Sequence, residues 1–183
     1  SRVVFLADPV NGQNELFLAP IDGGQAPLQL ASGYTFYADA KFSPDGERVV
    51  FVAQSTQSGI YSVRADGSEA PVKLSLDGDV VTERYFDFSP DGHWVVYRAS
   101  TSTSDDFRLF ARPVDGSLAG PVTLTAPHVD GNVGRNHWFI SEWPFTITPD
   151  SSRVLYRADH GFEAIQEFLD IPEVLELYSS PLP

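Results

Sequence analysis

The feature that most constrains this chain is one segment that occurs three times in nearly the same form. The copies read KFSPDGERVVFVA from Lys41, DFSPDGHWVVYRA from Asp87 and TITPDSSRVLYRA from Thr146, and a shorter copy, SRVVFLA, begins at Ser1. Repetition at a regular interval indicates one supersecondary unit used several times, as in a solenoid, an array or a propeller. The repetition therefore argues against a mixed globular fold.

Each unit predicts four antiparallel strands. In the copy that begins at Lys41, Pro44-Asp45-Gly46 has turn chemistry, because proline fixes φ and glycine tolerates a positive φ. Residues 48–53 are apolar and mostly β-branched or aromatic, as in a strand covered on both faces. Residues 60–65 and 71–75 predict a third and a fourth strand. Four-stranded sheets repeated at intervals of about 40–50 residues are typical of a β-propeller.

We therefore predict an all-β chain, a β-propeller segment of about four four-stranded antiparallel blades. The predicted blades cover residues 1–31, 36–76, 83–125 and 142–183, and the first and last of them are partial. The chain contains no methionine, even at position 1. We expect it to be a stretch of a longer protein.

The Phe-Ser-Pro-Asp-Gly segments at Phe42 and Phe88, each followed by an apolar strand, resemble the TolB-like β-propeller repeats of bacterial envelope and secreted proteins. The third copy departs from the pattern only by Thr148 in place of serine and Ser151 in place of glycine. The resemblance covers the whole chain and implies a periplasmic or extracellular location. The same repeat also builds the propeller of prolyl-oligopeptidase-like peptidases, so the resemblance leaves the function open.

Composition excludes several classes of function. The chain has 12 Lys+Arg against 25 Asp+Glu and a net charge of −13, so we expect no nucleic-acid partner, which would require clustered cations. It has no cysteine and therefore no disulfide, thiolate nucleophile or cysteine-ligated zinc. No apolar run approaches the roughly 20 residues of a membrane span, so we expect no membrane insertion.

Motifs that carry chemistry are also missing from the sequence. There is no Gly-x-Ser-x-Gly elbow for a hydrolase nucleophile and no Walker or dinucleotide-binding motif. Residues 77–79 and 130–132 have the first acidic positions of a calcium loop but lack the remaining ligands, so we interpret them as turns. From these absences we expect no cofactor, no metal and no enzymatic activity.

The variation in length between repeats falls on two of the four connections. The turn between strands one and two is constant, and the spacing from the third strand to the fourth is eleven or twelve residues. The link from strand two to strand three runs from seven to nineteen residues, and the link between units from seventeen to twenty-eight. In an antiparallel meander the two variable links emerge at the same end of the sheet. Variable loops on a repeated scaffold are where binding is normally placed.

Two long insertions fall on that variable end. Residues 126–143 mix hydrogen-bonding groups with two tryptophans, a composition that suits peptide or carbohydrate recognition or the anchoring of the loop on the blade edge. Residues 159–174 have apolar side chains at helical spacing and predict a short amphipathic helix, either at the propeller mouth or over its own blade. The candidate ligand-binding residues are His128, Asp130, Asn136, His137, Trp138, Trp143 and His160.

We predict a non-catalytic binding module of a secreted or cell-envelope bacterial protein, which presents these loops to a protein, a peptide or a glycan. The alternative is the substrate-gating propeller of a prolyl-oligopeptidase-like serine peptidase whose catalytic domain lies outside this chain. A third possibility is a spacer in a large surface protein. An open arc of blades leaves its two end sheets uncovered, so we expect further blades of the same protein or packed copies of the chain to cover them.

Overall fold

The computed structural model describes residues 1–8, 14–34, 36–53, 58–77, 79–101, 107–125, 145–159 and 175–183. In these ranges every regular element is a β-strand, and the strands form four antiparallel sheets. Each strand pairs with its neighbours in the sequence, so each sheet is a simple meander. The all-β architecture predicted from the repeats is confirmed.

The first and last sheets have three strands, and the two between them have four. The first sheet contains β1 (Arg2–Ala7), β2 (Glu15–Pro20) and β3 (Leu28–Ala31). The second contains β4 (Phe36–Phe42), β5 (Arg48–Ala53), β6 (Gly59–Arg64) and β7 (Val72–Lys73). The third contains β8 (Asp79–Phe88), β9 (Trp94–Thr101), β10 (Phe107–Pro113) and β11 (Val122–Thr123). The fourth contains β12 (Phe145–Ile147), β13 (Arg153–Asp159) and β14 (Leu175–Pro181).

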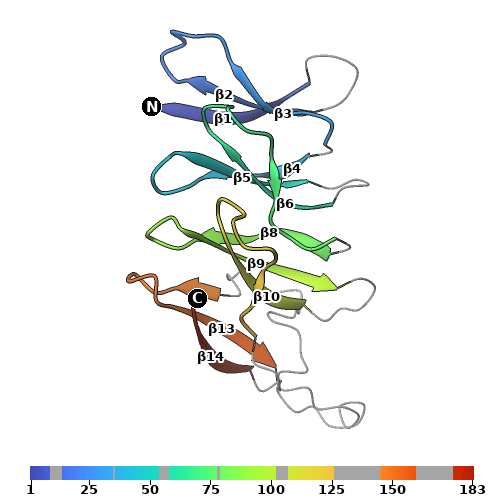
Figure 1. The fold of residues 1–183 in the computed structure, drawn as a ribbon, viewed down its shortest axis with the longest axis vertical. Helices are drawn as coiled ribbons and strands as arrows, with labels where there is room; N and C mark the ends of the chain where they lie inside the picture. The colour runs from blue at the N-terminus through green and yellow to red at the C-terminus, as the bar shows by residue number, and fades with distance from the viewer. Residues whose placement is uncertain are drawn as a thin grey trace.

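The four sheets follow one another along the long axis of the molecule, in the order of the sequence (Figure 1). The sheet that contains the N-terminus lies at one end of the stack, and the sheet of β13 and β14 lies at the other. The Pro-Asp turns between β4 and β5, β8 and β9, and β12 and β13 project on the same side, at the left of Figure 1.

A short hydrogen-bond network explains why Ser-Pro-Asp-Gly ends one strand and begins the next. The N–H of Gly46 donates to the carbonyl oxygen of Ser43 at 2.8 Å and closes the turn. The Ser43 hydroxyl donates to Oδ1 of Asp45 at 2.5 Å, and its oxygen accepts from the N–H of Arg48 at 2.9 Å. Asp45 Oδ1 also accepts from the N–H of Glu47 at 2.9 Å. The serine and the aspartate therefore satisfy backbone donors that a bare turn would leave to water.

The same network recurs at the other two copies. The distances from the serine or threonine hydroxyl to the aspartate are 2.5 Å for Ser89 and Asp91 and 2.6 Å for Thr148 and Asp150. Threonine therefore replaces serine without loss of the bond. Ser151 takes the place of the turn glycine and still adopts a positive φ of 58°, although that region favours glycine.

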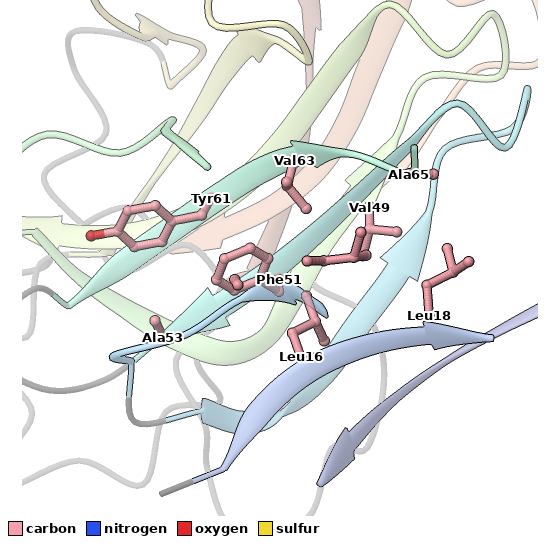
Figure 2. Close-up of a cluster of buried hydrophobic side chains, with 10 residues drawn as sticks. Leu16, Leu18, Val49, Phe51, Ala53, Tyr61, Val63 and Ala65 are labelled. Atoms are coloured by element: carbon pink, nitrogen blue, oxygen red, sulfur yellow. The ribbon is translucent and has the colours of Figure 1, made fainter. Parts of the chain in front are cut away.

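The core lies between the sheets, in three clusters of buried side chains. The second strand of each complete unit is the best covered, because a strand flanks it on each side and a sheet packs on each face. Figure 2 shows part of the cluster between the first two sheets, in which Leu16 and Leu18 of β2 face Val49 and Phe51 of β5. The second-strand residues predicted to be covered are at most 2% exposed: Val49, Phe51, Val95, Tyr97, Val154 and Tyr156.

A stacked aromatic pair occurs once in every sheet, between the second and third strands of the unit. Phe51 of β5 lies opposite Tyr61 of β6, with ring centroids 5.5 Å apart and an interplanar angle of 13°. The other three pairs have centroid distances of 5.6 to 5.8 Å and angles of 18° to 24°. They are Phe5–Phe17, Tyr97–Phe110 and Tyr156–Tyr178. In the second, third and fourth sheets the pair faces the preceding sheet.

Candidate binding face

The turn end of the stack is locked by contacts between neighbouring sheets. The N–H of Asp91 donates to the hydroxyl oxygen of Ser151 at 3.0 Å, and a guanidinium nitrogen of Arg2 donates to the carbonyl oxygen of Gly46 at 2.5 Å. The turn that contains Gly92 lies against Pro44, whose Cδ would be 3.5 Å from a Cβ at that glycine. These contacts fix the turn end and leave the opposite end to carry loops of different length.

The two long insertions are attached at that opposite end. The segment from 126 to 144 follows β11 and precedes β12, and the segment from 160 to 174 follows β13 and precedes β14. Both join strand ends that lie away from the Pro-Asp turns, because neighbouring strands are antiparallel. The predicted helix and all seven candidate residues lie outside the described residues, so their mutual arrangement stays a prediction. The seven are His128, Asp130, Asn136, His137, Trp138, Trp143 and His160.

The described part of the loop end carries an aromatic cluster that the sequence analysis did not identify. The ring of Tyr34, from the link between the first two sheets, packs edge-on against Tyr61 at 4.9 Å and against Phe51 at 5.7 Å. The Tyr61 side chain points its hydroxyl away from the apolar cluster, toward the end of the sheet where Ala53 lies (Figure 2). Tyr34 is half-buried, so the cluster reaches the surface at the loop end.

Burial keeps the two phenols of this cluster protonated. Burial raises the pKa of Tyr61 to about 12, and the neighbouring Tyr34 and Asp77 add to the rise. Burial also raises the pKa of Tyr34. Both phenols are therefore protonated at neutral pH and can donate as well as accept a hydrogen bond. The Lys73 ammonium donates to Asp77 Oδ1 at 2.7 Å and lowers the pKa of that carboxyl group, so Asp77 is ionised beside the phenols.

Arg98 is a buried cation in the third sheet. It lies in the central strand β9, is 3% exposed, and its guanidinium carbon sits 5.3 Å from the centroid of the Tyr85 ring. Burial lowers the pKa of Arg98 to about 10, so the group keeps its charge at neutral pH. The equivalent position in the second sheet is Val52, an aliphatic core residue. The sequence signal was the change from Val-Ala to Arg-Ala between copies, which the prediction of an apolar strand overlooked.

The described residues include no group of three or more histidine, aspartate or glutamate side chains placed to hold a metal ion. Within the same part of the chain, no helix has the length and apolar character needed to cross a membrane.

No protein-family model matches the chain, and a comparison with curated proteins gives no significant match. Solved structures do match it over nearly all of its length. TolB from Acinetobacter baumannii aligns with 99% of the chain at 16% identity and a TM-score of 0.54. The tricorn protease aligns with 99% at 12% identity and a TM-score of 0.66. Oligogalacturonate lyase from Vibrio parahaemolyticus aligns with 100% at 17% identity and a TM-score of 0.58.

This chain has a β-propeller fold. The likeness to TolB supports the TolB-like form of propeller that the repeats indicate, and at these identities it concerns the fold alone. The propeller segment spans 40%, 17% and 46% of the length of the three matched proteins.

The comparisons correct one prediction. The sequence analysis expected no enzymatic activity, because the sequence contains no catalytic motif. The Vibrio protein is a lyase by name, and its structure matches the whole of this propeller segment. The absence of a Gly-x-Ser-x-Gly elbow from this chain says nothing about other reactions, so the expectation had no physical basis.

Proposed function

We propose that this propeller segment binds a peptide or protein partner through its loop end. The observation that supports the proposal is the difference between the two ends of the stack. Hydrogen bonds join neighbouring sheets at the turn end, such as that from Asp91 to Ser151. The loop end has connections of variable length and the half-buried ring of Tyr34. A rigid scaffold with variable loops at one end is the usual arrangement of a binding surface.

The chemistry of the loop end favours a partner with basic and apolar groups. The net charge of the chain is −13, which attracts cationic partners over long range and repels anionic ones. The half-buried ring of Tyr34 offers an apolar face, as aromatic residues in binding sites commonly do, and the exposed carboxylate of Asp77 offers hydrogen-bond acceptors. A neutral glycan would use the same two features and is the next class to test.

A second candidate is the gate of a peptidase, in which the propeller limits access of substrate to a catalytic domain outside this chain. The likeness to the tricorn protease, with a TM-score of 0.66, favours this candidate. We also propose a periplasmic or extracellular location, because the TolB-like repeats identified in the sequence are typical of envelope and secreted proteins.

The proposal is tested by screening the chain against a library of immobilised peptides and an array of neutral glycans. We expect binding of basic peptides, lost in the variants Trp138→Ala and His137→Ala without a change in melting temperature. Asp22→Asn, at the turn end, is the control and should bind as the parent does. A fall of several degrees in the melting temperature of the two variants would instead make these residues anchors of the loop. Loss of binding in the control would show that the loop end is not the binding surface.

A further inference from the structure

Five Asp-Gly peptide bonds lie within the described turns, and this pair of residues can modify itself without an enzyme. The backbone nitrogen of the glycine attacks the carboxyl carbon of the aspartate, because no side chain on the glycine blocks the approach. The bonds follow Asp22, Asp45, Asp66, Asp91 and Asp115. Since the residue pair is the same in every turn, the way in which each turn holds its aspartate decides where the reaction occurs.

The reaction passes through a succinimide ring. The glycine nitrogen bonds to Cγ of the protonated carboxyl group, and the amide proton and the carboxyl hydroxyl leave together as water. Water then adds to one of the two carbonyl carbons of the ring. Breaking the bond from nitrogen to Cγ restores aspartate, whereas breaking the bond from nitrogen to the main-chain carbonyl carbon gives isoaspartate. Water is the only co-reactant, and no atom is oxidised or reduced.

The turn of the second sheet holds both reacting groups. The hydroxyl and the N–H of Ser68 donate to Oδ1 of Asp66 at 2.6 and 2.9 Å. These bonds, the hydroxyl first, lower the pKa of Asp66 from 3.8 to about 2, so the protonated carboxyl group that reacts is rare at neutral pH. The N–H of Gly67 donates to the carbonyl oxygen of Arg64 at 3.0 Å. This turn therefore opposes the reaction at the carboxyl group and at the nitrogen.

Hydroxyl groups hold the aspartate in three further turns. Those of Ser43 and Ser89 donate to the aspartates of two Pro-Asp turns at 2.5 Å each. At Asp115 the N–H of Ser117 and then its hydroxyl lower the pKa of the carboxyl group. In each of these turns an N–H and a hydroxyl act on the same carboxylate.

Asp22 differs because a second glycine, Gly24, follows its turn glycine where Asp66 and Asp115 are followed by serine. The N–H of Gly24 donates to Oδ1 of Asp22 at 3.0 Å, and no hydroxyl among the described residues donates to this carboxylate. The N–H of Gly23 lies 3.2 Å from the carbonyl oxygen of Pro20, the longest such bond in the five turns. The two reacting groups are thus held by fewer and longer bonds.

We propose that the bond between Asp22 and Gly23 is a site of spontaneous modification, at which the chain forms a succinimide and then isoaspartate. Fewer hydrogen bonds must break before the Gly23 nitrogen reaches Cγ of Asp22. One hydrogen bond is worth about fivefold in an equilibrium constant, so we expect the reaction to be at least about fivefold faster than at Asp66.

The difference arises from bonds within each turn, so it does not depend on what packs against the first sheet. Asp22 lies at the turn end of the stack, away from the variable loops. The inference is therefore independent of the proposed binding function, and a failure of either leaves the other unchanged.

Incubation of the full chain at neutral pH in water enriched in heavy oxygen tests the proposal. Each opening of a succinimide by solvent leaves one heavy oxygen atom on the residue. Tandem mass spectrometry after digestion in ordinary water locates this label, and electron-transfer fragmentation identifies isoaspartate. We expect the label at Asp22 to accumulate at least about fivefold faster than at Asp66, and isoaspartate to accompany it. Equal label in all five turns, or label in none, would overturn the proposal.

Two variants test whether the missing hydroxyl is the cause. Gly24→Ser gives the turn the Asp-Gly-Ser sequence found at Asp66 and Asp115, and because Gly24 does not have a positive φ, a serine fits without backbone strain. The label at Asp22 should fall at least about fivefold, to the level at Asp66. Ser68→Gly makes the reverse change in the second sheet and should raise the label at Asp66 by the same factor.

Gln25→Ser is the matched control, since it adds a hydroxyl one residue beyond the position that bonds to the carboxylate. Its label at Asp22 should equal that of the parent. Melting temperatures show whether each variant has folded, and the comparison between turns of the parent needs no variant. A folded Gly24→Ser chain that is labelled at Asp22 as fast as the parent would overturn the proposal, because the hydroxyl would then not be the group that prevents the reaction.

Discussion

The hydroxyl oxygen of Ser151 accepts a hydrogen bond of 3.0 Å from the backbone N–H of Asp91, so that the Pro-Asp turns of the third and fourth sheets are joined directly. Ser151 makes this bond from a φ of 58°, where the other two copies have glycine at 73° and 76°. The only departure from glycine in the three turns thus provides a contact between sheets that glycine cannot make.

At position 151 the left-handed backbone conformation lowers the stability of the fold, and the hydroxyl hydrogen bond raises it. Ser151→Ala and Ser151→Gly both remove the hydroxyl, but only alanine keeps the unfavourable backbone conformation. We expect Ser151→Gly to have a free energy of unfolding about 1 kcal/mol higher than that of Ser151→Ala. Urea denaturation of the two variants measures the difference. Equal stabilities would mean that the turn relaxes out of the left-handed region.

The aspartates of the Pro-Asp turns predict a loss of stability in acid. The Thr148 hydroxyl, followed by the hydroxyl and the N–H of Ser152, lowers the pKa of Asp150 from 3.8 to about 2. A carboxyl group with a lowered folded pKa stabilises the fold above its unfolded value, and this contribution disappears as the pH falls through the folded value. The melting temperature should therefore drop between about pH 4 and pH 2.

Asp150→Asn separates this contribution from the general effect of acid. Because the amide does not titrate, the variant should be less stable than the parent at neutral pH and should lose less stability between about pH 4 and pH 2. Melting curves of both proteins at a series of pH values give the comparison. Parallel curves would show that Asp150 plays no part in the acid transition.

Replacing a turn glycine by alanine should cost more stability where a neighbouring sheet packs closely against the turn. A Cβ added at Gly116 would lie 2.5 Å from Cγ1 of Val72 in the preceding sheet, whereas a Cβ at Gly23 would meet nothing within 4 Å. Both glycines have a similar φ, so backbone strain is the same. We expect Gly23→Ala to cost about 1 kcal/mol and Gly116→Ala about 3 kcal/mol of unfolding free energy. Equal losses would contradict the close approach of β7 to this turn.

The aromatic pairs predict how much the packing between neighbouring sheets contributes to the free energy of unfolding. Phe51 is 1% exposed between two sheets, and Phe5 occupies the same register position on the face of the first sheet that no described sheet covers. Phe51→Ala should lower the free energy of unfolding by about 3–5 kcal/mol. Phe5→Ala should cost less than half of that, measured by urea denaturation at a dilution where the chain is monomeric. A loss below about 1 kcal/mol for Phe51→Ala would place β5 at the periphery of the fold.

Much of the fold was predictable because its chemistry is local. The Pro-Asp turns form their networks within six residues, from Ser43 to Arg48, so the repeated segment is enough to specify strand, turn and strand. The burial of Val49 and Phe51 followed from a run of β-branched and aromatic residues that can only lie between two sheets. For the same reason the strand order predicted which connections share an end of the stack.

Features that depend on distant parts of the chain were not predictable in this way. Tyr34 enters the aromatic cluster because the link between two sheets returns across Tyr61, and nothing in its sequence neighbours indicates that contact. Whether Arg98 lies in the core or at the surface depends on the sheet that packs over it. The candidate residues between 126 and 160 remain a prediction from loop length and composition.

The sequence by itself determined that this protein is a stack of repeated antiparallel sheets, because turn chemistry and strand hydrophobicity act over a few residues. Only the tertiary structure decided which faces meet. The stacking of Tyr97 on Phe110 and the aliphatic row of Val50, Val52 and Ile60 beneath them involve different strands of two sheets, which register and stacking bring together.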